Sequence, residues 1–218
     1  MITVFGEGRG FRVVWLLEEM GLPYQLRPVD LIAGVEDDAE FLAINPAGFI
    51  PALQDGAVTM VESIAIMEYL IARHGPTPLA PDPHDTAFAP YQQFLHLGEA
   101  GLGASMYIVV VSRNLAPEDD KQNWAARFAL EAFENRLGLV TRRLAHAPYM
   151  AGDQFTAADI SVTWALEFAQ RTQCYTLGAA ERAYLARTTA RDGYKRAMNV
   201  CTATKAWAER AAAEVAAP

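Results

Sequence analysis

The chain has 218 residues, of which 52% are hydrophobic and 20% charged, and its formal net charge is −8. This length suffices for one large domain or two small ones, while the acidic balance and the lack of any block of Lys or Arg argue against nucleic-acid binding. No run approaches the ~18 apolar residues of a membrane span, and the first residues lack the basic and apolar pattern of a secretory leader, so we expect no leader and a cytoplasmic protein without membrane contact.

Cysteine and histidine usage gives no sign of a disulfide framework or a metal centre. Cys174 and Cys201 lie far apart, which fits a reducing compartment, and we expect each to be a small buried residue. The histidines, at positions 74, 84, 96 and 146, show no metal-ligand spacing, so no metal site is expected.

The first elements form a strand, a helix and a second strand. Apolar residues predict a strand over 2–5 and an amphipathic helix over 11–20, which Gly21 and Pro23 end. Residues 24–29 predict a strand. We therefore expect a parallel pair of strands joined by a right-handed crossover.

The loop Gly6-Glu7-Gly8-Arg9-Gly10 admits a nucleotide interpretation, because glycines after a first strand allow a pyrophosphate to approach a helix N-terminus. Two features argue against it. Phe11 occupies the position of the last required glycine, and the remainder of the chain lacks the alternation of strands and helices that a doubly wound sheet needs.

The stretch Asn45-Pro46-Ala47-Gly48-Phe49-Ile50-Pro51-Ala52-Leu53 predicts a loop that enters a strand. A proline at the start of a strand donates no ladder hydrogen bond, so the backbone of Ile50 is left to pair with something outside the sheet, such as a peptide-like ligand. Strands over 51–54 and 58–61 form a hairpin on Asp55-Gly56, and a helix is expected over 63–74.

The second half of the chain predicts only helices. Prolines at 76, 78, 81 and 83 mark a linker over 77–83 between domains at 1–76 and 84–218. Helices are expected over 85–114, 117–146, 157–171, 181–189, 193–198 and 202–215. Thr156 and Asp159 form a variant capping box at the start of the third of these, and we assign both to structure.

The pattern Asn-Pro-x-Gly-x-Ile-Pro-x-Leu, followed by Asp-Gly and Glu-Ser-x-Ala-Ile-x-x-Tyr-Leu, resembles the bacterial-type cytosolic glutathione S-transferases over nearly the whole chain. The resemblance implies an N-terminal thioredoxin-like domain, hence α/β, followed by an all-helical domain. It also implies a cis Pro51, an Ile50 backbone that pairs with the cysteine of glutathione, and a grip by Glu62 and Ser63 on its γ-glutamyl end. The alternative that these two side chains only cap a helix stays open. Phe49 stands in this glutathione-binding stretch where similar proteins often carry Lys or Gln.

The chain departs from the family at the catalytic hydroxyl. Residues 8–24 resemble the family pattern Ser-Arg-x-x-Arg-Val-x-Trp-x-Leu-Glu-Glu-x-Gly-Leu-Pro-Tyr, but Gly8 stands where the Ser is expected. The guanidinium of Arg9 is the candidate replacement, since a nearby cation lowers the pKa of a thiol. The alternative is that Arg9 is a solvated loop residue.

The resemblance implies a detoxification enzyme, acting as a homodimer, that conjugates the thiolate of its co-substrate glutathione to a small apolar electrophile. Glu99 and Tyr107 are the candidate substrate-pocket residues, on the first long helix of the second domain. Two alternatives remain, a binding module without transferase activity and a glutathione-dependent disulfide reductase. The sequence does not identify the electrophile.

Overall fold

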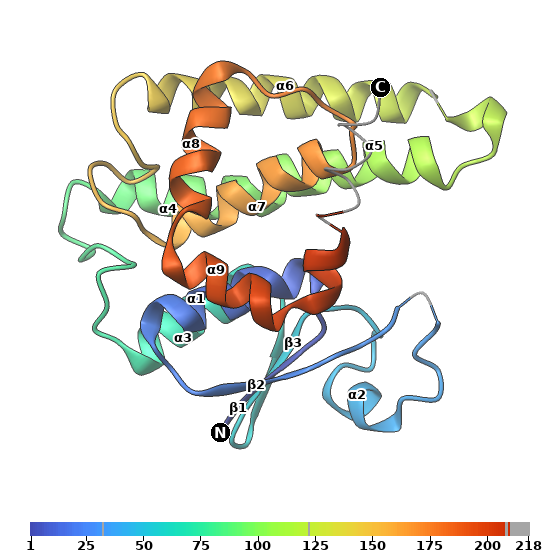
Figure 1. Ribbon diagram of the computed structural model, residues 1–218, viewed down its shortest axis with the longest axis vertical. Coiled ribbons are helices and arrows are strands. Elements are labelled where there is room, and N and C mark those ends of the chain that lie inside the picture. Colours follow the sequence, from blue (N-terminus) through green and yellow to red (C-terminus); the bar gives the residue numbers. More distant parts are fainter. Residues whose placement is uncertain (32, 122, 208, 210–218) are drawn as a thin grey trace. The chain divides into compact units, whose positions relative to one another are not determined.

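A computed structural model describes residues 1–31, 33–121, 123–207 and 209 (Figure 1). The chain divides into two compact units. The first comprises Met1–Thr77 together with Arg191 and the described residues after it, and the second comprises Pro78–Ala190. The sequence-based domain boundaries placed every residue from 84 onward in the helical domain, so the structure differs in grouping the segment after Ala190 with the first unit.

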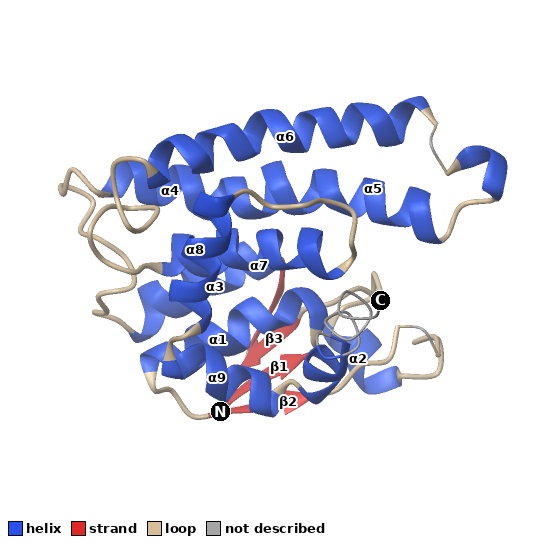
Figure 2. Cartoon of the chain, turned by 45° about the horizontal axis from the view of Figure 1, so that its top comes forward, coloured by secondary structure: helices blue, strands red, loops and turns tan. Residues whose placement is uncertain are grey.

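The first unit contains a four-stranded sheet of order β2-β1-β3-β4, drawn in red in Figure 2. Its strands are β1 (Ile2–Phe5), β2 (Tyr24–Arg27), β3 (Ala52–Asp55) and β4 (Val58–Val61). β1 pairs with β2 in parallel and with β3 antiparallel, and β3 and β4 form an antiparallel hairpin, as predicted. The second strand was expected to reach residue 29 but ends at Arg27, because Pro28 has no N–H for the ladder.

Three helices of the first unit are α1 (Phe11–Met20), α2 (Ala39–Ile44) and α3 (Ser63–His74), and the bounds of the first and third are those predicted. α1 ends at Gly21, whose φ of 66° allows the left-handed cap. α1 and α3 pack together, whereas α2 packs on β3, where Phe41 joins Phe5 and Ala52 in a buried cluster. This is the thioredoxin-like arrangement.

The helix α9 (Asp192–Val200) lies along α1 (Figure 1). Arg191 forms two hydrogen bonds with the Glu19 carboxylate, at 2.8 and 2.7 Å, and Arg196 donates to Glu18 at 2.7 Å. These contacts place α9 in the first unit. Because α1 and α9 are far apart in the sequence, no local pattern predicts that they pack together. Residues 202–207 are helical, whereas 208 and 210–215 of the predicted 202–215 helix lie outside the described residues.

The second unit is helical. Its elements are α4 (Phe88–His96), the π-helix η2 (Leu97–Gly103), α5 (Ala104–Asn114), the 3-10 turn η3 (Glu118–Asp120), α6 (Trp124–Leu144), α7 (Ala157–Arg171) and α8 (Ala179–Thr189). The predicted helix over 117–146 begins only at Trp124, because the Asn123 side chain caps it by accepting from the Ala126 N–H at 2.9 Å. The π-helical turns were not predicted.

The helix α7 forms the core of this unit. Ser161 donates to the carbonyl of Leu95 at 2.7 Å, and a Cβ at Gly98 would lie 2.3 Å from the Ser161 hydroxyl oxygen, so the two backbones meet where only glycine fits. The predicted capping box of Thr156 and Asp159 is present. Asp159 is fully buried and accepts from the Met150 N–H and the Tyr184 hydroxyl, which confirms its structural role.

In the described part of the chain, the continuous helical stretch Phe88–Asn114 is long and apolar enough to cross a membrane by length and composition alone. Half of its most apolar window is buried within the protein. Packing against α6 and α7 accounts for this composition, as expected for the core helix of a helical unit.

Candidate functional site

The loop that precedes β3 is organised by Asn45, a residue that is only 3% exposed. Its side-chain amide donates to the carbonyl of Phe49 at 2.6 Å, and its side-chain oxygen accepts from the Ala47 N–H at 3.1 Å. Gly48 completes the turn with a φ of 67°. The sequence interpretation recognised the Asn-Pro and Gly signals of a loop but missed that Asn45 is buried and holds the loop together.

Ile50 and Pro51 leave this loop just before the sheet begins. Their peptide bond is cis, as the resemblance implied. The first pair of the β1–β3 ladder is Phe5 with Ala52, so the backbone N–H and carbonyl of Ile50 lie outside the ladder. Phe49 is 37% exposed.

The glycines of the Gly6–Gly10 loop fit against the cis peptide. A Cβ at Gly6 would come within 2.3 Å of Ile50 Cγ2, and a Cβ at Gly10 would lie 3.2 Å from Pro51 Cβ. Gly6 and Gly8 have φ values of 82° and 63°. Close packing and left-handed backbone therefore explain the glycine pattern without any nucleotide.

Glu62 and Ser63 lie at the N-terminus of α3. Glu62 is exposed and has a φ of 72°, whereas Ser63 is 2% exposed. Within the described chain, neither side chain hydrogen bonds to another residue, and Glu62 gives no capping bond, so the helix-cap interpretation is not supported. Left-handed backbone at a residue other than glycine costs about 1–3 kcal/mol and concentrates at ligand sites.

The sheet brings these segments together at one end of its strands. Ala52 pairs with Phe5 on β1 and with Val61 on β4. The residues adjoining these three positions in the chain are Gly6, Pro51 and Glu62, which therefore gather at the same end of the sheet. The four predicted ligand residues from Ile50 to Ser63 and the glycine loop thus form one candidate site.

Arg9 lies in the 3-10 turn η1 (Gly8–Gly10), between Gly8, which faces Ile50, and Gly10, which faces Pro51. It is half-buried, and its carbonyl accepts from Nε of Arg12, which is fully buried on the first turn of α1. Its neighbour Glu7 is 9% exposed and accepts from the Thr204 N–H at 2.7 Å. Sequence reasoning missed Glu7, because its partner lies almost two hundred positions away and no local pattern marks the contact.

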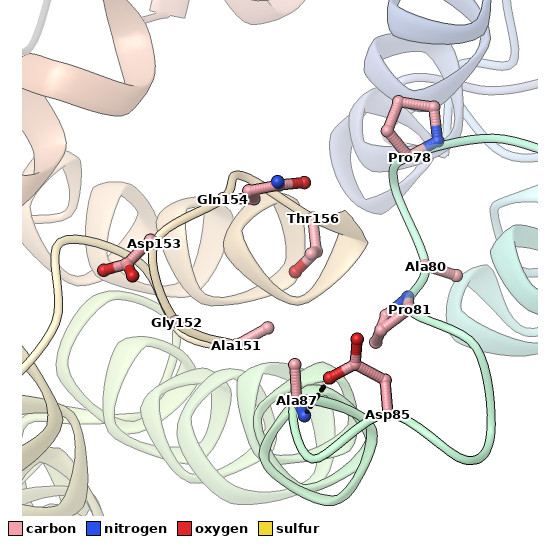
Figure 3. A pocket seen from close by; sticks show the side chains of 10 residues that line it. All are labelled: Pro78, Ala80, Pro81, Asp85, Ala87, Ala151, Gly152, Asp153, Gln154 and Thr156. Carbon is pink, nitrogen blue, oxygen red and sulfur yellow. Dashed lines mark hydrogen bonds between the residues drawn. The ribbon is translucent and has the colours of Figure 1, made fainter.

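The two candidate substrate residues lie in the second unit, Glu99 half-buried on η2 and Tyr107 49% exposed on α5. A cavity of about 310 Å³ in this unit is lined by other residues (Figure 3): Pro78, Ala80, Pro81, Asp85, Ala87, Ala151, Gly152, Asp153, Gln154 and Thr156. The structure therefore does not bring Glu99 or Tyr107 into this cavity.

Neither cysteine belongs to the site as a nucleophile. Both are buried, as expected for small apolar residues. Burial, with a further contribution from the Glu7 and Glu18 carboxylates, raises the pKa of the Cys201 thiol far above its ordinary value. Cys201 therefore stays protonated at neutral pH and is not a candidate nucleophile.

Comparison with known proteins places these features in a family. Residues 10–73 match the profile "Glutathione S-transferase, N-terminal domain", and residues 122–210 match "Glutathione S-transferase, C-terminal domain". Glutathione S-transferase 3 of Schizosaccharomyces pombe is 31% identical over 192 residues, covering 81% of this chain and 72% of the relative.

Solved structures agree. The ternary complex of BphK, described as a bacterial GST, superposes with a TM-score of 0.79 at 26% identity, covering 92% of this chain and 99% of that one. The theta-class glutathione S-transferase of Xanthomonas axonopodis pv. citri, solved with glutathione bound, gives a TM-score of 0.74 at 25% identity, with coverages of 90% and 96%.

The two profiles and the fold define a two-domain protein of the glutathione-binding transferase class. The chain belongs to the glutathione S-transferase family. The expected α/β N-terminal domain followed by a helical domain is confirmed.

Proposed function

We propose that this protein is a cytoplasmic glutathione transferase that conjugates the glutathione thiolate to an electrophilic carbon of a small apolar compound. The observation that carries the proposal is the gathering of Ile50, Pro51, Glu62 and Ser63 at one end of the sheet. The Ile50 backbone lies outside the strand ladder there, and the side chains of Glu62 and Ser63 have no hydrogen-bond partner in the described part of the chain.

Each group suits one part of the tripeptide. The Ile50 backbone pairs with the cysteine of glutathione, in the manner of an added strand. The Ser63 hydroxyl and the free N–H groups at the start of α3 receive the γ-glutamyl carboxylate, while the Glu62 carboxylate faces the amino group. Phe49 contributes an apolar ring in place of a charged contact.

The site must then ionise the bound thiol. A thiol with a pKa near 8.5 is only a few per cent ionised at neutral pH. Gly8 supplies no hydroxyl, so the remaining candidates are the N–H groups at the start of α1 and the Arg9 guanidinium. Most of the rate would come from holding the thiolate beside the electrophile.

Calorimetric titration with glutathione, followed by an absorbance pH titration of the bound thiol, tests this proposal on wild type and Arg9→Ala. We expect binding, a lowered thiol pKa in wild type, and a return toward the free value in the variant. No binding at millimolar glutathione contradicts the proposal. Binding with a lowered thiol pKa in both proteins removes Arg9 from the mechanism and leaves the backbone amides.

A second function is favoured by Gly8, whose left-handed backbone and missing hydroxyl disfavour a standard transferase. Without thiolate stabilisation the protein is a glutathione-binding module, or it reduces small disulfides by thiol exchange with glutathione. Turnover of a small disulfide, measured beside turnover of an aryl halide, separates these functions.

We also propose Glu99 and Tyr107 as contacts for the electrophile, and a homodimer as the working form. Glu99→Gln and Tyr107→Phe should change KM for the electrophile without changing glutathione affinity. Light scattering across a dilution series measures the oligomeric state.

A further inference from the structure

Glu7 is an acidic side chain buried in the glycine loop of the candidate site. Its carboxylate accepts from the main-chain N–H of Thr204 at 2.7 Å and from that of Ala203 at 3.4 Å. Both N–H groups lie in the first turn of the helix over 202–207, where no carbonyl of that helix reaches them. Glu7 thus supplies the negative charge that a helix N-terminus favours, from a distant part of the sequence.

The partner segment is itself fixed to α1. We call residues 191–205 the C-terminal strap. Arg191 and Arg196 bind Glu19 and Glu18 in the last turn of α1, and Tyr194 packs edge-on against Phe11 and Trp15 with ring centroids 5.4 and 5.0 Å away. The strap therefore contacts α1 in both its first and its last turn, and its end reaches Glu7 in the loop before α1.

The loop is held on its other side by the ligand-binding segment. Gly6 and Gly8, on either side of Glu7, face the side chain of Ile50, and Gly6 also donates to the carbonyl of Arg27 at 2.9 Å. Gly10 donates to the carbonyl of Glu7 at 3.0 Å and begins the turn into α1. A displacement of Glu7 would therefore shift the amides that precede α1 relative to Ile50.

We propose that Glu7 is a positioning residue through which the C-terminal strap holds the Gly6–Gly10 loop against Ile50, so that the loop amides lie where the sulfur of glutathione binds. The proposal rests on the function proposed above and adds a residue to it. In a chain without the catalytic hydroxyl, amide placement is the main remaining control over the thiolate.

Hydrogen exchange of the Gly6–Gly10 loop tests, in the absence of ligand, whether Glu7 restrains this loop. Glu7→Ala removes the acceptor and Thr204→Pro removes the donor N–H. Thr204→Ala is the matched control, since it keeps the N–H. Exchange over residues 6–10, normalised to the amides of β3 in the same sample, should be about tenfold faster in the first two variants and unchanged in the third.

Binding and kinetics test the positioning. In Glu7→Ala and Thr204→Pro we expect about tenfold weaker glutathione binding, a bound thiol pKa nearer its free value, and a fall in kcat at saturating electrophile. Glu7→Gln keeps an acceptor oxygen and should lie between wild type and Glu7→Ala. The double variant should lose little more than Glu7→Ala alone, because the 2.7 Å bond between Glu7 and Thr204 is already absent in each single variant.

The failures are distinguishable. If wild type binds no glutathione, both the proposed function and the thiol-positioning role of Glu7 are contradicted. If wild type binds glutathione but Glu7→Ala leaves loop exchange, affinity and thiol pKa unchanged, only the role of Glu7 is overturned. Faster loop exchange with unchanged affinity and thiol pKa also overturns that role and leaves Glu7 as a purely structural contact.

Discussion

The side-chain amide of Asn45 donates to the carbonyl oxygen of Phe49 at 2.6 Å, across the loop that delivers Ile50 to the edge of the sheet. Asn45→Ala should therefore lower the free energy of unfolding by about 1–3 kcal/mol, because buried loop groups lose their partners, and should weaken glutathione binding. Asn123→Ala is the control, since it removes an exposed helix cap in the second unit. Equal glutathione affinity in the two variants contradicts the prediction.

Ser63→Ala should weaken glutathione binding about tenfold with little change in stability, since the hydroxyl has no hydrogen-bond partner among the described residues and a bond to a carboxylate is lost. Calorimetry and urea unfolding on the same preparation measure both quantities. A stability loss without an affinity loss would show that Ser63 acts only in packing.

Glu62 allows backbone strain to be separated from ligand contact, because its φ is 72°. Glu62→Gly and Glu62→Ala both remove the carboxylate and should weaken glutathione binding equally. Glu62→Gly should be the more stable of the two by about 1 kcal/mol, since glycine adopts this conformation without a Cβ penalty. Equal unfolding free energies would contradict a strained Glu62.

Gly8→Ser restores a hydroxyl at the position where the family pattern has one. A Cβ there would lie 3.7 Å from Ile50 Cδ1, an ordinary van der Waals contact, but the φ of 63° should cost about 1 kcal/mol of stability. We expect faster conjugation of an aryl halide. Gly21→Ser is the matched control, with a φ of 66° and open space around its Cβ. Similar rates in both variants would show that a hydroxyl is not what the site lacks.

Asp159 should make stability fall as the pH rises. Burial raises its pKa from 3.8 to about 6, against the lowering effect of hydrogen bonds from Met150 and Thr156. The folded protein therefore binds more protons than the unfolded chain in this range, and the contribution of Asp159, about 3 kcal/mol at most, is complete below the lower pKa and lost above the higher one. The difference in unfolding free energy between wild type and Asp159→Asn should decrease over this range.

Asp55 should give the opposite slope in the same pH series. Its hydrogen bond from His74 at 2.9 Å, with a smaller contribution from Tyr69, lowers its pKa. Its contribution to stability is present above its ordinary pKa and is lost as the pH falls. The difference between wild type and Asp55→Asn should therefore increase with pH, and a decrease with pH would contradict the assignment of Asp55.

Local signals predicted much of the fold. Gly21 ends α1 as a left-handed cap, and the apolar periodicity that begins at Ser63 gives the bounds of α3. The cis Pro51 was implied by the family resemblance of the nine-residue motif that contains it. In each case the residues that determine the structure lie within a few positions of one another, so a local sequence pattern is enough to predict it.

The features that were missed depend on distant partners. Glu7 was unremarked because its partner is Thr204, and Arg191 because its partner is Glu19. Asn45 is different, since its partners are local, but an Asn-Pro pair is typical of any loop and does not reveal burial. The π-helical η2 arises where Gly98 lets α7 approach, which periodicity along one helix does not show.

The division of the chain has a consequence for synthesis. The ribosome makes Met1–Thr77 first and the whole of Pro78–Ala190 next, and only afterwards the segment that carries Arg191, Arg196 and Thr204. Glu18 and Glu19 at the end of α1, and Glu7 before it, therefore lack these partners until the whole helical unit has been translated. A nascent chain arrested before residue 191 should expose Trp15 and the glycine loop to chaperones and proteases, even when its sheet has already formed.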